Sequence, residues 1–217
     1  MRLSKETYNI LKNFAAINSN ILINPGNVLK TMSAGKNIYV EAKVTEDFDV
    51  AVPIWDLNKF LGVISMFANP DLEFHDTYVV ISNGRSSVKY FYSEPSLLTV
   101  PTREVKMPKT AITFDLDEKD LNEVLKAANI LQVSDFNLIG EDGKFYITVD
   151  DAGQSTSNSF QIILDENYTG PDYLGKIKVS DLKLYPGSYK VYLTKTIISK
   201  FVHESGNLFY IIATERE

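Results

Sequence analysis

The sequence predicts an α+β protein made of two similar halves, each combining helices with antiparallel strands. Two observations predict this class. Twelve Tyr, twelve Phe and many Val, Ile and Thr residues favour β-strands. One order of elements (helix, strands, short helix, strands) occurs twice along the 217 residues. This length allows one large domain or two domains of about 100 residues each, and the duplication favours two.

The first element is the stretch LSKETYNILKNFAAIN, residues 3–18, which has the spacing of an amphipathic helix. A helix turns about 100° per residue, so the apolar residues gather on one side and Lys5 and Lys12 lie opposite. Two side chains seven residues apart point almost the same way. With Ser4 as the expected N-cap, we expect a helix over about 4–18.

The rest of the first half alternates between strand and helix patterns. Apolar alternation broken by Pro25-Gly26 and Gly35 predicts strands joined by tight turns. WDLNKFLGVISMF returns to helical spacing and predicts a helix over about 55–67. The segments TYVVISN and SSVKYFYS predict a hairpin around Gly84. We expect the first domain to cover 1–105.

The stretch EPSLLTVPTREVKMPKT, residues 94–110, separates the halves, because it holds three prolines and little periodicity. Helix and strand patterns then restart, so the second domain is expected over 106–217. DEKDLNEVLKAANIL predicts a helix over about 117–131, capped by Asp117. An offset of 114 places Lys5 on Lys119 and Lys12 on Lys126.

A second short helix, over about 179–185, is predicted because its segment resembles one in the first half. KVSDLKLYPG resembles PIWDLNKFLG in the first half, with Asp181 standing where Asp56 stands. Two helices that match in order, with strand-rich segments between them, indicate a tandem duplication. The C-terminal stretch GSYKVYLTKTIISKFVHESGNLFYIIATE predicts three further strands.

Composition excludes several kinds of site. The chain has no cysteine, so disulfides, thiolate metal sites and a cysteine nucleophile are ruled out. Its two histidines, His75 and His203, lack the spacing of a metal-binding pair. No phosphate loop, dinucleotide fingerprint or nucleophile elbow occurs. We therefore expect no cofactor, no metal and no catalytic residue, and a soluble intracellular protein without a signal peptide or membrane span.

Two acidic pairs could hold Mg²⁺. They are Asp47 with Asp49 and Asp115 with Asp117. The simpler interpretation places the first pair at a loop-to-strand junction and the second at the entry to a helix, where carboxylates favour the helix dipole.

The lysines opposite the apolar helix faces are the strongest candidate site. One lysine-bearing face is what any surface helix shows, but its repetition in both halves favours a shared function. The net charge of −6 argues against coating nucleic acid by bulk charge. A local basic surface would bind phosphate without reading sequence. The candidate set is Arg2, Lys5, Lys12, Lys59, Lys119, Lys126 and Lys183.

Four segments resemble the DNA polymerase sliding clamps, specifically those of T-even-type bacteriophages. They are LSKETYNILKNFAAINS at 3–19, FDVAVPIWDLNKFLGVIS at 48–65, GRSSVKYFYSEPSLLTVP at 84–101 and LKLYPGSYKVYL at 182–193. The resemblance runs nearly end to end.

The resemblance implies a DNA-clamp fold, with helices on the inner face and sheets outside. It implies a non-catalytic homotrimeric ring that encircles duplex DNA and tethers the polymerase, working in the cytoplasm of the infected bacterial host. The lysines would then face phosphates in the central hole. Implied partners are the DNA, the polymerase, an ATP-driven clamp loader, further copies of the chain and, as the family allows, transcription machinery, but no membrane. Asn129 departs from the family's more basic second long helix.

The resemblance also implies a groove near the interdomain connector for short partner peptides. Val105, Met107, Pro108 and Tyr185 are candidates for it, and simple packing of the connector onto the sheets is the other interpretation. Two rival functions stay open. One is a β-rich oligomeric viral structural or assembly protein, and the other an enzyme that uses the acidic pairs with Mg²⁺.

Overall fold

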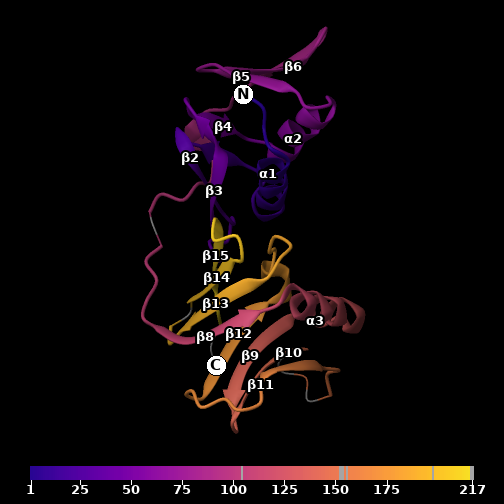
Figure 1. The fold of residues 1–217 in the computed structure, drawn as a ribbon, viewed down its shortest axis with the longest axis vertical. Helices are drawn as coiled ribbons and strands as arrows, with labels where there is room; N and C mark the ends of the chain where they lie inside the picture. The colour runs from indigo at the N-terminus through magenta and orange to yellow at the C-terminus, as the bar shows by residue number, and fades with distance from the viewer. Residues whose placement is uncertain (104, 152–153, 155, 197, 216–217) are drawn as a thin grey trace. The chain divides into compact units, whose positions relative to one another are not determined.

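The computed structural model describes residues 1–103, 105–151, 154, 156–196 and 198–215. The chain divides into two compact units, Met1–Glu104 with Asn207–Phe209, and Val105–Gly206 with Tyr210–Glu217. Figure 1 shows their elements. No helix in the described part of the chain is long and apolar enough to cross a membrane.

The first unit contains two helices and three groups of paired strands. The helices α1 and α2 pack against each other, and α1 also packs on β2 and β3. The strand pairs are β1 with β4 and β2 with β3, and β5, β6 and β7 form a three-stranded antiparallel sheet in that order. The bounds are α1 (Lys5–Ile17), β1 (Ile21–Ile23), β2 (Gly26–Met32), β3 (Ile38–Phe48), β4 (Val52–Ile54), α2 (Leu57–Ser65), β5 (Asp71–Phe74), β6 (Tyr78–Asn83), β7 (Ser86–Phe91) and the 3₁₀ turn η1 (Pro95–Leu97).

The described residues of the second unit form one α-helix and two sheets. Its four-stranded antiparallel sheet has the order β11-β10-β9-β12, with α3 packed against β10 and β11. A second run of neighbouring strands has the order β15-β14-β13-β8. The bounds are β8 (Thr110–Leu116), α3 (Glu118–Leu131), β9 (Asp135–Glu141), β10 (Lys144–Asp150), β11 (Phe160–Asp165), β12 (Tyr173–Lys178), the 3₁₀ turn η2 (Val179–Asp181), β13 (Tyr189–Thr194), β14 (Ile198–His203) and β15 (Leu208–Ala213).

The helices bury the faces that the apolar spacing predicts. In α1 the buried side chains include Ile10, Leu11 and Phe14. The α2 helix buries Leu57, Phe60, Leu61 and Ile64, and α3 buries Leu121, Val124 and Ala128. The expected hairpin around Gly84 is β6–β7, with Gly84 at φ +61° in the left-handed region that glycine adopts without strain.

The predicted helix over about 179–185 is wrong. Only the 3₁₀ turn η2 forms, and the chain then continues without regular structure to β13. Pro186 explains why, since a proline disfavours helical backbone at the residue before it, Tyr185, and donates no backbone hydrogen bond itself. The backbone of Tyr185 is held instead by two buried tyrosines. Its N–H donates to the Tyr210 hydroxyl at 3.1 Å, and its carbonyl accepts from the Tyr189 hydroxyl.

Candidate nucleic-acid interface

The α1 helix presents two lysines on its solvent face. Ser4 caps the helix as expected, because its Oγ accepts a hydrogen bond from the Thr7 backbone N–H at 3.1 Å. Lys5 and Lys12 are both exposed, whereas Ile10 between them is buried. The first unit therefore carries a pair of solvated ammonium groups about two turns apart along one helix face.

The α2 helix adds a third exposed lysine to the helices of the first unit. Asp56 caps it, with its carboxylate accepting from the Lys59 backbone N–H at 2.9 Å. Lys59 is exposed beside Asn58, and the Tyr8 hydroxyl donates to the Leu61 carbonyl at 3.3 Å, which links α1 to α2. The two helices pack side by side, so both lysine-bearing helices belong to one helical layer of this unit.

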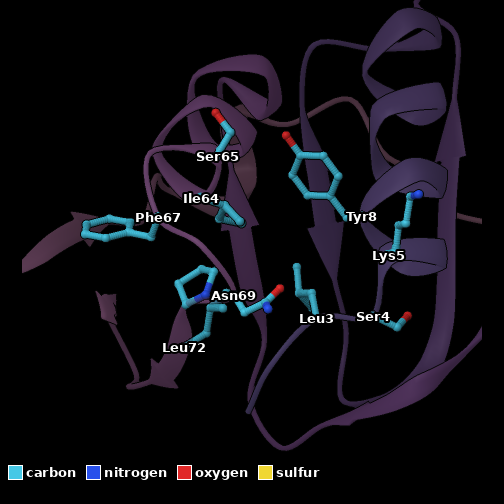
Figure 2. Close-up of a pocket in the computed structure, with 10 residues that line it drawn as sticks. Leu3, Ser4, Lys5, Tyr8, Ile64, Ser65, Phe67, Asn69 and Leu72 are labelled. Carbon is cyan, nitrogen blue, oxygen red and sulfur yellow. The ribbon is translucent and has the colours of Figure 1, made fainter. Parts of the chain in front are cut away.

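A pocket of about 300 Å³ lies between the start of α1 and the end of α2 (Figure 2). Leu3, Ile64 and Leu72 give it an apolar floor, and Lys5 and Tyr8 stand at its side. An apolar surface of this kind supports the aliphatic stem of a lysine while its ammonium group stays in water.

A buried carboxylate fixes the start of α1 on the sheet. Glu46 of β3 is 8% exposed and accepts hydrogen bonds from the Ser4 backbone N–H and the Thr7 hydroxyl. Burial by itself raises the pKa of Glu46, but the bonds from Ser4 and Thr7 outweigh it and hold that pKa below its ordinary value. An anion at this end of a helix also matches the positive end of the helix dipole. The sequence does carry a signal for this anchor, since Glu46 takes a core-facing place between Val44 and Phe48.

Arg2, another predicted DNA-facing residue, is engaged within its own unit. Its guanidinium donates to both carboxylate oxygens of Asp71, at 2.8 and 3.0 Å. This fork holds the pKa of Asp71 below its ordinary value. Both side chains are exposed, so the pair sits in solvent, where ion pairs are weak and easily exchanged.

The α3 helix of the second unit has a mixed charge. Lys119 and Lys126 are exposed, as are Asn122 and Asn129. The helix also carries Glu118, Asp120 and Glu123, so its three carboxylates outnumber its two lysines. The expected matching cationic faces therefore differ between the units, since α1 has two lysines and one acid.

Asp117 occupies the N-cap position of α3, but its side chain makes no capping hydrogen bond. The Glu118 backbone N–H donates instead to the Ser188 hydroxyl at 3.1 Å. The expected capping hydrogen bond from the Asp117 side chain is therefore wrong. Ser188, 70 residues after Glu118, accepts from the first backbone N–H of the helix instead.

The remaining predicted site residues lie outside the helices. Lys183 is exposed in the irregular segment after η2. Val105, Met107 and Pro108 lie in the irregular segment that leads to β8, and Val105 is exposed. The Tyr185 ring packs edge-on against His203 at 5.8 Å. Their assignment to a partner-peptide groove stays a prediction.

The two acidic pairs occupy ordinary structural positions. Asp47 lies within β3 and Asp49 just beyond it, while Asp115 lies in β8 within 3.9 Å of the Lys190 ammonium group. Within the described residues, no group of three or more His, Asp or Glu side chains is placed to hold a metal ion.

Sequence reasoning missed several exposed apolar side chains beside the lysines. Trp55 and Met66 flank α2, and Ile130 on α3 is 67% exposed. Their exposure cannot be read from helical spacing alone, because a position at the edge of an apolar stripe has the same sequence signature whether covered or open.

Comparison with known proteins decides the family. A family model described as "DNA polymerase processivity factor" matches residues 4–99, and one described as "gp45 sliding clamp, C terminal" matches residues 113–216. The sliding clamp of Escherichia phage RB69 is 30% identical over 226 residues, covering 100% of this chain and 98% of its own. The chain belongs to the bacteriophage sliding clamps.

Other relatives agree with this assignment. The sliding clamps of Enterobacteria phage T4 and Vibrio phage KVP40 are each 30% identical, with coverage of 98% or more of both chains. The chain is accordingly a sliding clamp, a processivity factor for a phage DNA polymerase. These matches give no support to the viral structural protein or to the Mg²⁺ enzyme.

Solved structures of sliding clamps share the fold at low sequence identity. The A. fulgidus PCNA bound to the C-terminal region of FEN-1 superposes with a TM-score of 0.71 at 14% identity, covering 97% of this chain and 95% of that one. The DNA polymerase III subunit beta sliding clamp from Bartonella birtlesii reaches 0.73 at 13% identity, covering 100% of this chain and 65% of that one. The expected two-domain α+β clamp fold is confirmed.

Proposed function

We propose that three copies of this clamp close into a ring around duplex DNA and hold the polymerase on its template without reading sequence and without catalysis. The end-to-end match to phage sliding clamps carries this proposal. We propose that each copy contributes two clamp domains, 1–105 and 106–217. Because a closed ring stays on DNA topologically, its individual phosphate contacts can be weak, which permits sliding.

The exposed lysines support a DNA-facing role for the helices. In this proposal Lys5, Lys12 and Lys59 of the first unit meet phosphates, together with Lys119 and Lys126 of the second. Arg2 and Lys183 complete the proposed set, and Arg2 would have to leave Asp71 to contact DNA. Since α3 carries more carboxylates than lysines, the first unit supplies most of the phosphate attraction.

Two open sheet edges support the assembly. Among the described residues, β7 of the three-stranded sheet pairs only with β6, whereas the other edge strand, β5, exchanges two backbone hydrogen bonds between Leu72 and Met1. Within the same described ranges, β11 of the four-stranded sheet pairs only with β10, whereas β12 is bridged by Glu215. An uncovered edge strand is a template for pairing with another chain.

The two open edge strands also have the same length and carry opposite charges. Each strand has six residues. The β7 strand carries Lys89 and the exposed Phe91, and β11 carries the exposed Ile163 and ends at Asp165. In the proposed ring, β7 of one subunit pairs with β11 of the next.

The proposal includes the finer partners that the family suggests. An ATP-driven loader opens the ring, and the polymerase, with transcription machinery as a further partner, docks a peptide beside the connector at Val105, Met107, Pro108 and Tyr185. The ring works in the cytoplasm of the infected bacterial host.

Primer extension with the cognate polymerase and loader tests the proposal. On a circular template the clamp should lengthen the products of single binding events, and on a linear template with free ends most of this gain should disappear, because a ring slides off. Equal stimulation on both templates would show a groove binder rather than a ring.

Reversal of two helix lysines tests the DNA-facing surface. Lys5→Glu with Lys126→Glu should leave thermal unfolding unchanged, since both side chains are exposed, and should shorten products on the circular template. Each lost phosphate contact should reduce the slope of log affinity against log salt by about 0.9.

The matched control for this reversal is Lys36→Glu with Lys195→Glu, which makes the same charge change at exposed positions off the helices. If both double variants shorten the products equally, the effect comes from net charge, and the assignment of the helix lysines is wrong.

A further inference from the structure

The four-stranded sheet of the second unit carries a continuous row of apolar side chains across one face. The register aligns Leu174 with Ile139, Ile139 with Tyr146 and Tyr146 with Ile163. Leu138 and Ile147, the next residues along β9 and β10, are fully buried and point to the other face. The row therefore lies on the face opposite to this buried layer, where Leu174 is 44% and Ile163 40% exposed.

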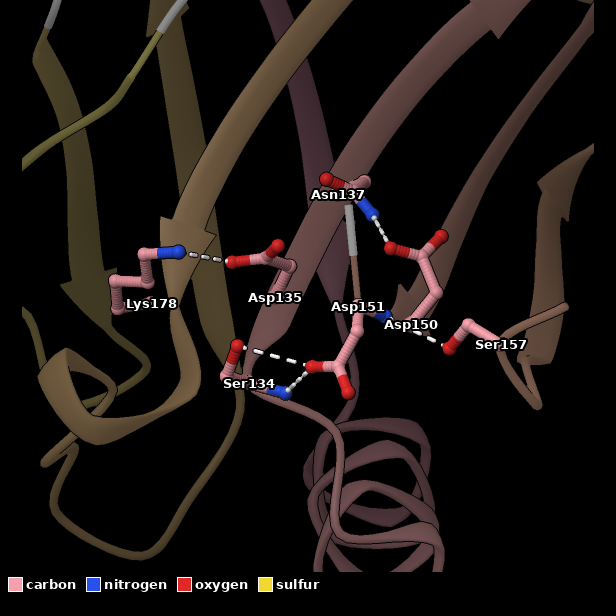
Figure 3. A network of polar contacts seen from close by, with 7 residues as sticks. All are labelled: Ser134, Asp135, Asn137, Asp150, Asp151, Ser157 and Lys178. Carbon is pink, nitrogen blue, oxygen red and sulfur yellow. Dashed lines mark hydrogen bonds and ion pairs between the residues drawn. The ribbon is translucent and has the colours of Figure 1, made fainter. Parts of the chain in front are cut away.

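The other end of the same face is polar, and its groups are paired. Figure 3 shows Asp135 bound to Lys178, Asp150 accepting from Asn137 at 3.0 Å and Asp151 accepting from Ser134 at 2.8 Å. Hydrogen-bonded partners satisfy this end within the unit. The apolar end, by contrast, is left open to solvent.

An open pocket of about 440 Å³ lies at the apolar end, between β9 and the start of β12. Ile139 and Leu174 line it with two carboxylates, Glu141 and Asp172. Asp172 directly precedes β12, next to the Tyr173–Gly140 pair, and Glu141 ends β9, where its partner on β10 is Lys144. In the described part of the chain, no ion pair includes either carboxylate.

Two neighbouring tyrosines have raised pKa values, to which these carboxylates contribute. The hydrogen bond to Glu141, together with burial, raises the pKa of Tyr146 to about 12. Burial and then the charge of Asp172 raise the pKa of Tyr168. An apolar pair next to two exposed carboxylates that form no ion pair among the described residues suits a ligand that is itself apolar and cationic.

We propose that this pocket, which we name the Leu174 pocket, binds a short peptide segment of a partner protein that carries a large apolar side chain flanked by lysine or arginine. The apolar side chain covers Leu174 and Ile139, and the cations neutralise Glu141 and Asp172. Nucleic acid does not fit this chemistry, because its phosphates would meet the two carboxylates. The inference does not rest on ring closure, since the second unit supplies every residue of the pocket.

The test uses the full chain and a fluorescein-labelled peptide, Lys-Leu-Lys-Phe-Leu-Arg, followed by fluorescence anisotropy. Leu174→Ser should weaken binding by at least about tenfold, the effect of exposing most of one buried leucine contact. Glu141→Gln with Asp172→Asn should weaken binding comparably and should remove most of its salt dependence.

Matched controls distinguish binding at this pocket from nonspecific electrostatic or hydrophobic binding elsewhere on the protein. Leu97→Ser removes another exposed leucine, and Asp47→Asn with Asp49→Asn removes two exposed carboxylates elsewhere, so both should bind like the unchanged chain. A peptide with serine in place of its apolar residues and one with glutamate in place of its cations should both fail to bind.

Three outcomes would overturn the inference. They are no binding by the unchanged chain, equal binding by Leu174→Ser, and a change in sedimentation of Leu174→Ser, which would make the surface a contact between copies. Extension on circular templates is measured with the same variant, so failure of peptide binding with processive synthesis intact would remove this inference and leave the proposed function standing.

Discussion

Glu46 illustrates how much of this fold depends on one buried carboxylate. It lies at a strand position where alternation calls for an apolar residue, and it accepts from both the backbone N–H of Ser4 and the hydroxyl of Thr7. The anchor therefore fixes where α1 begins and, through that, where Lys5 is presented. A buried polar group that is fully hydrogen-bonded stabilises, whereas one without its partner costs about 1–3 kcal/mol.

Glu46→Gln should lower the free energy of unfolding at pH 7 by about 1.5–3 kcal/mol, because an amide cannot replace a charged acceptor for two donors. The folded-state pKa of Glu46 is lowered from 4.5, so its contribution is fully present above pH 4.5 and is lost as the pH falls through the folded value. The difference between the two proteins should thus shrink on acidification. Urea unfolding across this pH range measures it.

Asp47→Asn is the matched control for this substitution. It changes the next carboxylate on the same strand, which is exposed, and should alter stability by less than about 0.5 kcal/mol at every pH. A pH-independent loss for Glu46→Gln would show that shape rather than charge holds α1 in place.

At the scale of elements, sequence periodicity predicted the helices and strands whose formation depends on residues nearby in the sequence. The α1 helix, the α3 helix and the β6–β7 hairpin follow from apolar spacing, a capping serine and turn glycines. The helix expected over 179–185 fails at Pro186, which the sequence does show, and other side chains then hold the irregular backbone that replaces it. Tyr189 and Tyr210 bind the backbone of Tyr185, and no local pattern reports them.

The features of the candidate site divide in the same way, into those that the local sequence predicts and those that it does not. Exposed lysines opposite an apolar stripe could be predicted, since the stripe itself sets the solvent side. The Arg2–Asp71 fork and the Leu174 pocket could not, because the first joins the N-terminal segment to β5 and the second depends on how β12 pairs with β9.

Gly62 gives a prediction at the same scale. It lies within α2 on the exposed side, and a Cβ there would meet nothing within 4 Å. A glycine within a helix costs about 0.5–1 kcal/mol relative to alanine. Gly62→Ala should therefore raise the unfolding temperature of the DNA-free protein by about 1–4 °C, measured by calorimetry.

Gly84→Ala serves as the control for Gly62→Ala. A Cβ at Gly84 also meets open space, but its φ of +61° is unfavourable for alanine, so the unfolding temperature should fall. A decrease for both variants would mean that α2 is strained in a way that its backbone does not show.

At the scale of the whole molecule, the proposed ring assembles by pairing of the open edges of β7 and β11. Phe91→Glu or Ile163→Glu places a charge on an apolar edge that is 65% or 40% exposed. Each change should leave the subunit folded and convert trimers to 24.5 kDa monomers in sedimentation velocity. Leu97→Glu, at an exposed apolar residue outside both strands, should leave the trimer intact. Persistence of the trimer in both edge variants would require a different assembly surface.

The first unit takes one of its backbone partners from the far end of the chain. The Lys43 N–H donates to the Asn207 carbonyl at 2.7 Å, and Asn207–Phe209 belong to this unit. A first unit produced without residues 207–209 therefore lacks the segment that accepts from Lys43, and β3, which lies next to β15 in the sheet order, keeps an unpaired edge.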